Sequence, residues 1–442
     1  MVFKRSPRGR AVLLLSAVFI TIGIVGSFQA ELPFLYLGIG LLLYYYVSKL
    51  VLQLKVSGLN RLEVTRDVPS RVDEEQGIDV TVSMTNPTFL RLGAEVMDSY
   101  PPFCRLTAGT NVATVNIPAK GYSRLSYSLS TTSVGAQQFG QLRLLVRDIA
   151  GPFFFERDID VKGRVEVTPK GDVIPRGALA TLSISTYGGT VASRRKGEGF
   201  DFADIRKYMV GDPYKRIEWS STARSRQLMV RETMAETQLN VMVALDVTET
   251  MAYGEAGQTK LDYSARAVAS LARYLAARGD SVGLTLMGGP DSTQVIPLAH
   301  GNLQVTRILR ALGGLTFVPD DPKAVDTAVR RALALGQIKG RGLFLVITDL
   351  DSEVDLSPLK NLLAMKHEVI VISPYTPLFE AHGLGGLDRV LYAVNTAHQR
   401  LARRKLLKDA SKIGVRVFDV GPKDFFPKLI ARVEDMRRMG GS

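Results

Sequence analysis

The strongest constraint on this chain is a pair of long apolar runs near its N-terminus. Between Arg10 and Lys49 the only charged residue is Glu31, and apolar side chains dominate 11–28 and 32–48. Each run approaches the ~20 residues that an α-helix needs to cross ~30 Å of hydrocarbon. The pattern therefore predicts two membrane helices joined by a short turn.

Basic residues flank both runs and predict how this hairpin is oriented. They are Lys4, Arg5, Arg8 and Arg10 before the first run, and Lys49, Lys55 and Arg61 after the second. Positive charge stays on the cytoplasmic side, so we expect a multi-pass cell-membrane protein with its soluble body in the cytoplasm. The helices are expected over about 11–28 and 32–52, within a region 1–55, with Tyr44–Tyr46 at the membrane interface. A cleaved signal peptide over 1–27 is the alternative, but its apolar core is normally only ~7–15 residues long.

Composition excludes several classes of protein. The chain has 442 residues, 46% of them hydrophobic and 22% charged, which is ordinary for a globular protein of about three domains. A single cysteine, Cys104, excludes a disulfide framework and a thiolate zinc cluster. We expect Cys104 to be a small buried residue. Lys and Arg outnumber Asp and Glu by 56 to 43, a net charge of +13 that favours acidic partners.

Three further regions follow the hairpin, so the chain is multidomain. Residues 56–165 contain short alternating strands separated by Gly, Pro and Asn, which predicts a β-sandwich. Residues 237–442 alternate apolar strands with amphipathic helices, which predicts a Rossmann-like α/β domain whose mainly parallel sheet is covered on both faces. Its strands are expected at 239–246, 281–288, 342–349, 368–373 and 415–420.

The segment between these domains, 166–236, is rich in basic residues. Ten basic residues face five acidic ones over 194–231, and the only tryptophan, Trp219, lies among them. Basic residues mixed with aromatics are typical of nucleic-acid or anionic-lipid binding. We favour an ordinary solvated or intramolecular surface and no specific nucleic acid, because no known nucleic-acid motif is present. We expect Trp219 to pack as an anchor. Arg206 and Arg216 would then be free to pair with acids of the chain's own α/β domain or of a partner.

Two expected strands of the α/β domain end in aspartate, Asp246 and Asp349. Ligands of open parallel sheets bind outside the carboxyl ends of the strands. Asp246, Thr248 and Thr250 alternate, so their side chains are expected to point the same way, and Thr316 follows a glycine turn. Carboxylate and hydroxyl oxygens suit Mg²⁺ or another hard divalent cation. The alternative is that these residues are helix caps and turn formers.

This spacing resembles the metal-ion-dependent adhesion site of the von Willebrand factor A fold. The usual motif is Asp-x-Ser-x-Ser, then a Thr in a glycine-rich loop, then an Asp after a later strand. Asp246, Thr248, Thr250, Thr316 and Asp349 match in order, with threonine at both serine positions. The resemblance implies that these five residues hold a metal ion, with one coordination position open to an acidic side chain of a partner.

The basic segment resembles the signature of the domain-of-unknown-function-58 (DUF58) family. The resemblance implies two membrane helices, a β-sandwich, this signature and a von Willebrand A-like domain, and a MoxR-type AAA+ ATPase encoded nearby. The matching stretches include Gly199-Phe200, Arg206-Lys207-Tyr208, Gly211-Asp212-Pro213, Arg216-Ile217-Glu218-Trp219 and Val230-Arg231-Glu232. Arg206, Tyr208, Gly211, Asp212, Arg216, Trp219 and Arg231 are thereby the signature or partner-binding candidates.

We therefore expect a non-enzymatic, membrane-anchored protein-interaction module that depends on a divalent cation. By resemblance it is an adaptor for a MoxR-type AAA+ ATPase that acts with other membrane-complex proteins in assembly or maturation. One alternative is an anionic-lipid or nucleic-acid scaffold that uses 194–231. Another is a metal-assisted hydrolase, for which Glu249 is the candidate acid or base, although it alternates away from the ligands.

Overall fold

The computed structural model describes two compact units, 1–167 and 168–442, and each is considered by itself. The described residues are 4–26, 32–59, 61–89, 91–147, 152–171, 196–234, 239–338, 340–350, 355–380, 385–422 and 425–439. Two expected features lie outside them: the membrane turn with Glu31, and Arg194 and Arg195 of the basic segment.

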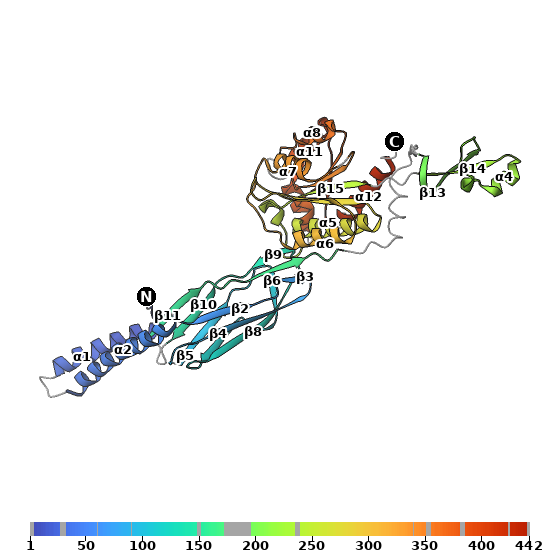
Figure 1. Ribbon diagram of the computed structural model, residues 1–442. Helices are drawn as coiled ribbons and strands as arrows, with labels where there is room; N and C mark the ends of the chain where they lie inside the picture. Colours follow the sequence, from blue (N-terminus) through green and yellow to red (C-terminus); the bar gives the residue numbers. More distant parts are fainter. Residues whose placement is uncertain are drawn as a thin grey trace. The chain divides into compact units, whose positions relative to one another are not determined.

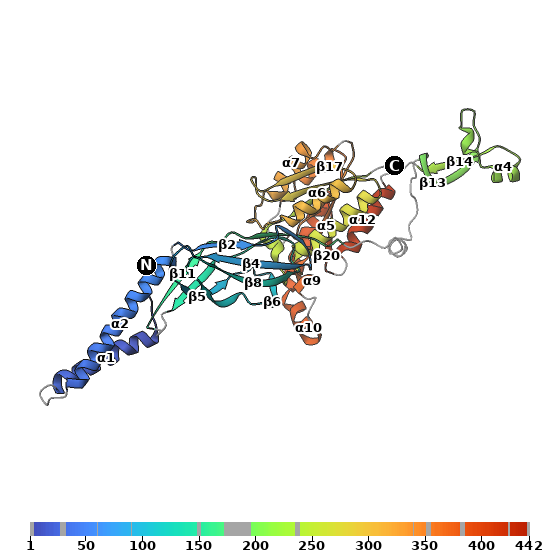
Figure 2. The ribbon, with the colours of Figure 1, turned by 60° about the horizontal axis from the view of Figure 1, so that its bottom comes forward.

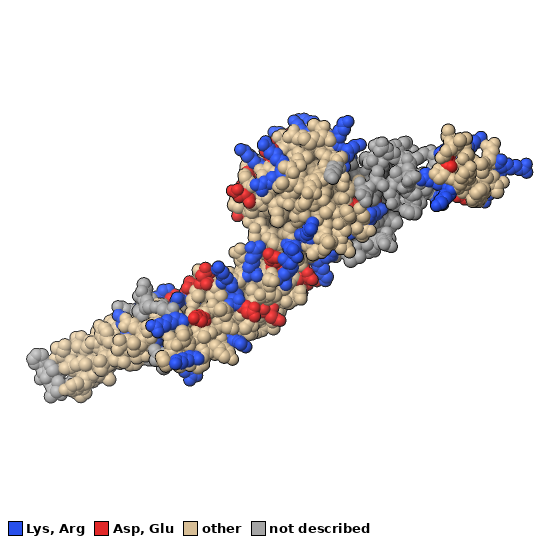
Figure 3. All heavy atoms as spheres, viewed as in Figure 1, with Lys and Arg blue, Asp and Glu red and all other residues tan. Residues whose placement is uncertain are grey.

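The first unit begins with two long helices, α1 (Pro7–Gly26) and α2 (Leu32–Leu59), which lie side by side (Figures 1 and 2). Both are long and apolar enough to cross a membrane. Their apolar side chains point outward; Leu14 is 65% exposed and Tyr36 66% exposed. Figure 3 shows a nearly uncharged surface over this pair, in contrast to the sandwich that follows. An apolar surface of this kind favours lipid over water.

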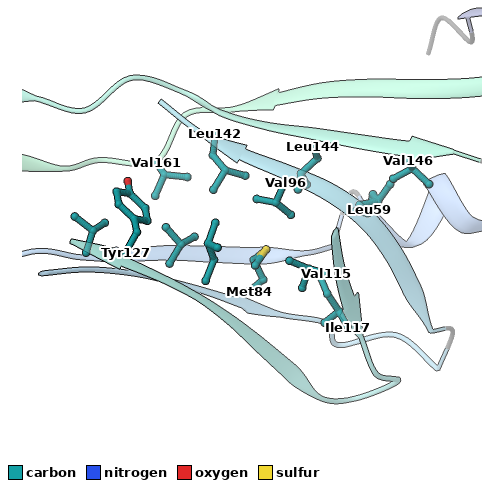
Figure 4. Close-up of a cluster of buried hydrophobic side chains, with 14 of the residues drawn as sticks. Leu59, Met84, Val96, Val115, Ile117, Tyr127, Leu142, Leu144, Val146 and Val161 are labelled. Atoms are coloured by element: carbon teal, nitrogen blue, oxygen red, sulfur yellow. The ribbon is translucent and has the colours of Figure 1, made fainter. Parts of the chain in front are cut away.

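The sandwich contains a five-stranded sheet ordered β1-β11-β10-β5-β7 and a four-stranded sheet ordered β2-β4-β8-β6, with a smaller sheet β3-β12-β9. Inward side chains of both larger sheets meet in one core, drawn in Figure 4. Cys104 is 5% exposed within it, as predicted, and burial raises the pKa of its thiol to about 11. The strands are β1 (Lys4–Arg5), β2 (Glu63–Asp67), β3 (Arg71–Asp73), β4 (Gly77–Thr85), β5 (Leu92–Asp98), β6 (Cys104–Gly109), β7 (Val112–Ile117), β8 (Tyr122–Thr131), β9 (Gly135–Gln138), β10 (Leu142–Arg147), β11 (Phe153–Ile159) and β12 (Arg164–Thr168).

Helix α2 runs past residue 52 to Leu59 and joins the sandwich core. The buried residues Tyr45, Leu52, Val56 and Leu59 are spaced as one face of a helix. The Arg157 guanidinium donates to the Leu59 carbonyl oxygen at 2.7 Å. Strand β1, just before α1, pairs with β11. Both body-side ends of the helical pair are therefore fixed to the same sandwich.

A fully buried ion pair links the two larger sheets. Arg66 of β2 contacts the Asp98 carboxylate of β5, and neither side chain is exposed to solvent. The same guanidinium donates to the Val161 carbonyl at 2.6 Å, and the Tyr127 hydroxyl of β8 donates to Asp98 Oδ2 at 2.7 Å. Burial and the Asp98 charge hold the pKa of Tyr127 above its usual range. Each buried charge thus has several partners, as burial requires.

The α/β body of the second unit is built on a six-stranded sheet ordered β17-β16-β15-β18-β19-β20. Its strands are parallel except β17, which pairs antiparallel with β16. The strands are β15 (Asn240–Asp246), β16 (Ser281–Met287), β17 (Gln294–Ala299), β18 (Leu343–Ile347), β19 (Glu368–Pro374) and β20 (Arg416–Val420). The five parallel strands were expected from the sequence. Strand β17 was not, because it is a half-buried edge strand that contains Pro297, which an edge tolerates.

Helices cover both faces of this sheet: Figure 1 shows α5, α6 and α12 on one face and α7, α8 and α11 on the other. Their apolar stripes were the sequence signal for this layering. The helices are the short η3 (Glu249–Ala252), α5 (Lys260–Ala277), α6 (Asn302–Gly313), α7 (Ala324–Leu335), α8 (Leu359–Ala364), α9 (Thr376–Glu380), α10 (Gly386–Asn395), α11 (Ala397–Lys412) and α12 (Phe425–Met439).

Replacing Arg66 by Met should destabilise the sandwich by about 3–5 kcal/mol, because the Asp98 carboxylate is left buried without its counter-charge. Urea unfolding of the full chain in detergent measures the loss. The matched control is Arg143→Met, whose pair with Asp158 is solvent-exposed and contributes little to stability. Equal losses for the two variants contradict the prediction.

Acidification should destabilise the α/β body through His367. Burial lowers the pKa of this histidine below its ordinary value of 6.5, and its Nδ1 accepts a hydrogen bond from the Gly342 amide at 3.1 Å. As the pH falls below about 6.5, His367 therefore takes up its proton in the unfolded chain before it does so in the folded chain. The free energy of unfolding should thus be lower in acid than at pH 7.5. In His367→Asn the free energy of unfolding should vary less over this window, whereas His300→Asn, at an exposed position, should follow the wild type.

Candidate functional site

Three loops meet at the carboxyl edge of the sheet, where the strand order reverses. Strands β15 and β18 are parallel neighbours, so Asp246 and Thr348 lie at adjacent strand ends. The loop 315–318 joins them because the Val318 amide donates to the Val247 carbonyl at 3.1 Å, and the Glu249 amide donates to the Val318 carbonyl at 3.0 Å. This is the position where open α/β sheets bind ligands.

Asp246 is the centre of a buried hydrogen-bond network. Its Oδ1 accepts from the Thr248 amide at 2.9 Å and the Thr248 hydroxyl at 2.7 Å, and its Oδ2 accepts from the Thr348 hydroxyl at 2.7 Å. Burial raises the pKa of Asp246 to about 6; the nearby Asp349 charge adds to the rise, and the three hydrogen bonds oppose it. The carboxylate therefore organises the loop that follows β15.

A chain of hydroxyls leads from this carboxylate toward the surface. The Thr248 and Thr250 hydroxyl oxygens are 3.0 Å apart. Since Thr248 donates its proton to Asp246, Thr250 is the donor to Thr248. Thr250 is half-buried and Thr316 is exposed. The structure thus brings Asp246, Thr248 and Thr250 into direct contact, while Thr316 lies on the adjoining loop with its side chain in solvent.

Asp349 has an internal cation as its partner. The Lys260 ammonium donates to Asp349 Oδ2 at 2.9 Å, and neither side chain is exposed to solvent. Lys260 is the first residue of α5, behind a capping box made by Thr259 and Asp262. The ammonium also lies 5.4 Å from the centre of the Tyr253 ring. Sequence reasoning missed Lys260, although a lysine in the first turn opposes the helix dipole and is a signal of a special role.

A second cation supports the backbone of Asp349. The buried Arg403 donates to the Asp349 carbonyl oxygen at 3.0 Å and pairs with Asp419 of β20. The Ser373 hydroxyl donates to the same carbonyl at 2.8 Å. Sequence reasoning also missed Arg403, because it lies on a helix of ordinary basic composition and nothing local marks it as buried.

These residues do not fit a divalent cation as arranged. Asp246, Thr248 and Thr250 offer the hard oxygens that Mg²⁺ prefers. The Asp349 carboxylate, however, is already neutralised by Lys260, and a dication ~4 Å from a buried ammonium is repelled by several kcal/mol. Among the described residues, His, Cys, Asp and Glu form no group of three that could hold a metal ion, which does not test a site built mainly from threonine hydroxyls. Magnesium binding stays a prediction from the sequence.

The signature residues form a separate antiparallel hairpin, β13 (Lys196–Lys207) with β14 (Met229–Met234). Arg206 holds Asp212 through two hydrogen bonds of 2.7 Å, so its partner is an acid of the same turn and not the expected acid of the α/β domain or of a partner protein. These bonds lower the pKa of Asp212 to about 2, and Asp212 also accepts from the Met209 amide at 2.9 Å. Gly211, at φ +109°, completes the turn in a conformation that favours glycine.

The turn presents large apolar side chains to solvent. Val210 is 100% exposed, Tyr214 75% and Trp219 67%. The expectation that Trp219 packs as an anchor is therefore wrong, because it begins a seven-residue helix, α4 (Trp219–Ser225), which has no buried residue. Tyr208 stacks on Tyr214 with ring centres 6.1 Å apart. Arg216 lies in a short helical turn, η2 (Tyr214–Arg216), and Arg231 lies opposite Ile205 in the hairpin.

Residues 204–380 match the model of a family described as "Protein of unknown function DUF58". This part of the chain is similar to the DUF58 family. The matched range takes in the hairpin from Asp204 onward and the three loops of the carboxyl edge. The matched range therefore includes both features that were predicted from the sequence outside the apolar helices: the basic segment, and the aspartates and threonines of the carboxyl edge.

The chain is also similar to curated proteins of mycobacteria. It is 26% identical over 182 residues to "Uncharacterized protein Rv1480" of Mycobacterium tuberculosis and, equally, to "Uncharacterized protein Mb1516" of Mycobacterium bovis. Each match covers 41% of this chain and spans 56% of the relative's length.

Similarity to solved structures is low. The conserved hypothetical protein BatB from Bacteroides thetaiotaomicron is 14% identical, with a TM-score of 0.31, over 45% of this chain and 98% of BatB. The cupredoxin domain of amoB from Nitrosocaldus yellowstonii is 11% identical, with a TM-score of 0.17, over 23% of this chain and 87% of that domain. At these scores the similarity assigns neither fold nor function.

Replacing Lys260 by Met should cost about 3–5 kcal/mol of stability, because Asp349 is left as an uncompensated buried carboxylate. Mg²⁺ should then raise the unfolding midpoint of Lys260→Met by supplying the missing charge, whereas neither Mg²⁺ nor EDTA should shift the wild type. Thermal unfolding in detergent checks both statements, with Lys360→Met, at an exposed position, as control. A saturable rise of the wild-type midpoint with Mg²⁺ would show that the cation displaces Lys260.

Proposed function

We propose that this protein is a membrane-anchored protein-interaction module that recognises its partner at the carboxyl edge of the α/β sheet. The proposal rests on the contrast between buried acidic side chains and exposed aromatic side chains at this edge. Its acidic groups are buried and held by internal donors, while aromatic side chains on the same loops are exposed: Tyr253 at 58% and Phe317 at 37%. Exposed aromatics on rigid loops are typical of protein-recognition surfaces.

The internal bonding at the edge favours binding over catalysis. A general acid or base has to reach the substrate, whereas Asp246 is 4% exposed and Asp349 is fully buried. Both carboxylates serve to fix the conformation of the loops around them. The proposed role of the edge is therefore to hold a recognition surface in one shape, which lowers the entropy cost of binding a partner.

We further propose that the body is von Willebrand A-like. The six-stranded order with the antiparallel edge strand β17, and an aspartate at the end of the central strand β15, support this proposal. The DUF58 resemblance extends it to an adaptor for a MoxR-type AAA+ ATPase acting on membrane complexes. In this proposal the partner contacts the loop side chains, and no step requires a bound metal ion.

The helical pair is proposed to span the membrane as a hairpin, with the body in the cytoplasm. Strand β1 and the end of α2 both attach to one sandwich, so the N-terminal and C-terminal ends of the pair are on the same side. Basic residues at both of these ends, Lys4, Arg8, Lys49 and Lys55, support the cytoplasmic side.

The signature hairpin favours a second candidate function, contact with an anionic lipid surface. Its exposed Val210, Tyr214 and Trp219 lie among basic residues such as Lys207 and Lys215. Amphipathic aromatic side chains near Lys and Arg suit a membrane interface. In the full-length protein, the double variant Val210→Ser, Trp219→Ser should bind anionic vesicles more weakly than the wild type if this candidate holds. Its binding to the vesicles should equal that of the wild type if the hairpin binds protein.

A photo-crosslinking residue at position 253 tests the main proposal. In native membranes it should capture an AAA+ ATPase, identified by mass spectrometry, and EDTA should not reduce the yield. The matched control is position 335, because Leu335 is also 58% exposed but ends the helix that leads into β18 at the opposite edge of the sheet. Equal capture at both positions, or capture without an ATPase, would refute the adaptor role.

A further inference from the structure

The part of the helical pair that extends beyond the sandwich is shorter than the hydrocarbon core of a bilayer. Tyr45 of α2 is 4% exposed and packs on Phe153 with ring centres 4.7 Å apart. Val12 and Leu13 of α1 pack against the same core. Only residues 32–44 of α2 lie beyond this contact, roughly 20 Å at 1.5 Å per residue, against the ~30 Å that a span requires. The sandwich end at Phe153 must therefore reach the membrane interface if the pair is to span.

Strand register identifies the loops at this end. Leu92 and Ile117 are paired, and the register places them at the end of the five-stranded sheet where β11 begins and meets β1. Figure 4 shows Ile117 and Val146 together at one end of the core, with Tyr127 at the other. The loops before Leu92 and after Ile117 therefore extend toward the free part of the helices.

These loops carry exposed aromatic side chains, each in contact with a basic one. Phe89 is 80% exposed, and the Lys120 ammonium lies 4.1 Å from the centre of its ring. Tyr122 is 62% exposed, and the Arg124 guanidinium lies 5.1 Å from its ring. Arg91 is close by in sequence and donates to Asn116 at 3.0 Å. We name these five residues, Phe89, Arg91, Lys120, Tyr122 and Arg124, the sandwich tip.

Backbone bonds hold the two loops of the sandwich tip together. The Lys120 amide donates to the Thr88 carbonyl, and the Asn86 amide donates to the Gly121 carbonyl, both at 2.9 Å. The Asn86 side chain also donates to the Pro118 carbonyl at 3.0 Å. The exposed aromatics are thus presented by a fixed platform, which lowers the entropy lost when they are immobilised in an interface.

We propose that the sandwich tip sits in the headgroup region of an anionic bilayer and forms a second membrane contact beside the helical pair. Aromatic rings favour the interface, and Lys and Arg are attracted to anionic lipid. Glu63 lies in the same cross-strand row as Tyr122 and offsets part of the charge of the three basic residues. The inference rests on the proposed membrane anchorage.

Tryptophan fluorescence in bilayers tests the inference. Trp219, the only tryptophan, is first replaced by Phe, and a single tryptophan is then placed at Phe89, at Leu106 or at Ile22 of the full chain. Leu106 is the control, because it is 38% exposed but pairs with Leu129, seven residues from Tyr122 along β8. Each variant is reconstituted in phosphatidylcholine bilayers with and without phosphatidylglycerol, containing phospholipid brominated near the headgroup.

Phe89→Trp should show a blue shift and strong loss of emission, greater with phosphatidylglycerol, whereas Leu106→Trp should show neither. Adding Lys120→Gln and Arg124→Gln should remove the phosphatidylglycerol effect. The inference is overturned if the tryptophan emission of Phe89→Trp is not quenched while that of Ile22→Trp is quenched. That result would leave the membrane anchorage intact. If Ile22→Trp is also unquenched, the anchorage fails with it.

Discussion

A charge taken out of water has to be neutralised where it is buried, and both units of this protein are organised around that constraint. In the sandwich, Arg66 and Asp98 join strands of the two larger sheets. In the α/β body, Lys260 and Asp349 join the start of a helix to the end of a strand. A buried ion pair is weak evidence for net stability but strong evidence for a specified geometry. Losing either partner leaves a buried charge without its counter-charge, which is strongly destabilising. Each pair therefore determines which elements can be neighbours.

The same constraint changes the interpretation of the carboxyl edge. Two aspartates and two or three threonines at the ends of parallel strands suggest a divalent cation when they are read as a sequence. In the fold, an ammonium from the chain itself already contacts one of the two aspartates. The hydroxyls then serve mainly to satisfy Asp246, and the loops they organise carry exposed aromatic side chains to the surface. In the proposed function, these internal charges hold the recognition surface in one shape.

The first unit couples the apolar helices to a folded domain through direct packing of α2 and pairing of β1. Helix α2 continues into the sandwich core through its last buried turns, and β1 adds a strand on the other side of the pair. Because α2 itself packs into the sandwich core, the position of the helices determines the position of the sandwich. If the helices span a bilayer as proposed, their depth also sets the depth of the sandwich tip.

The sequence by itself determined the elements whose signal is local. Apolar length predicted the two helices, alternation predicted strands such as β4 and β8, and continuous apolar runs predicted the five parallel strands of the body. Asp246 and Asp349 could be assigned to one edge because parallel strands place their carboxyl ends together. Edge strand β17 was missed because half-burial and a proline weaken its pattern. Only the tertiary structure could decide that Lys260 neutralises Asp349, that Arg403 supports its backbone, that Trp219 is exposed and that Tyr45 packs on the sandwich. Whether a charge or a ring is buried depends on residues far away in the chain. A local sequence pattern does not show which of those residues become its neighbours in the fold.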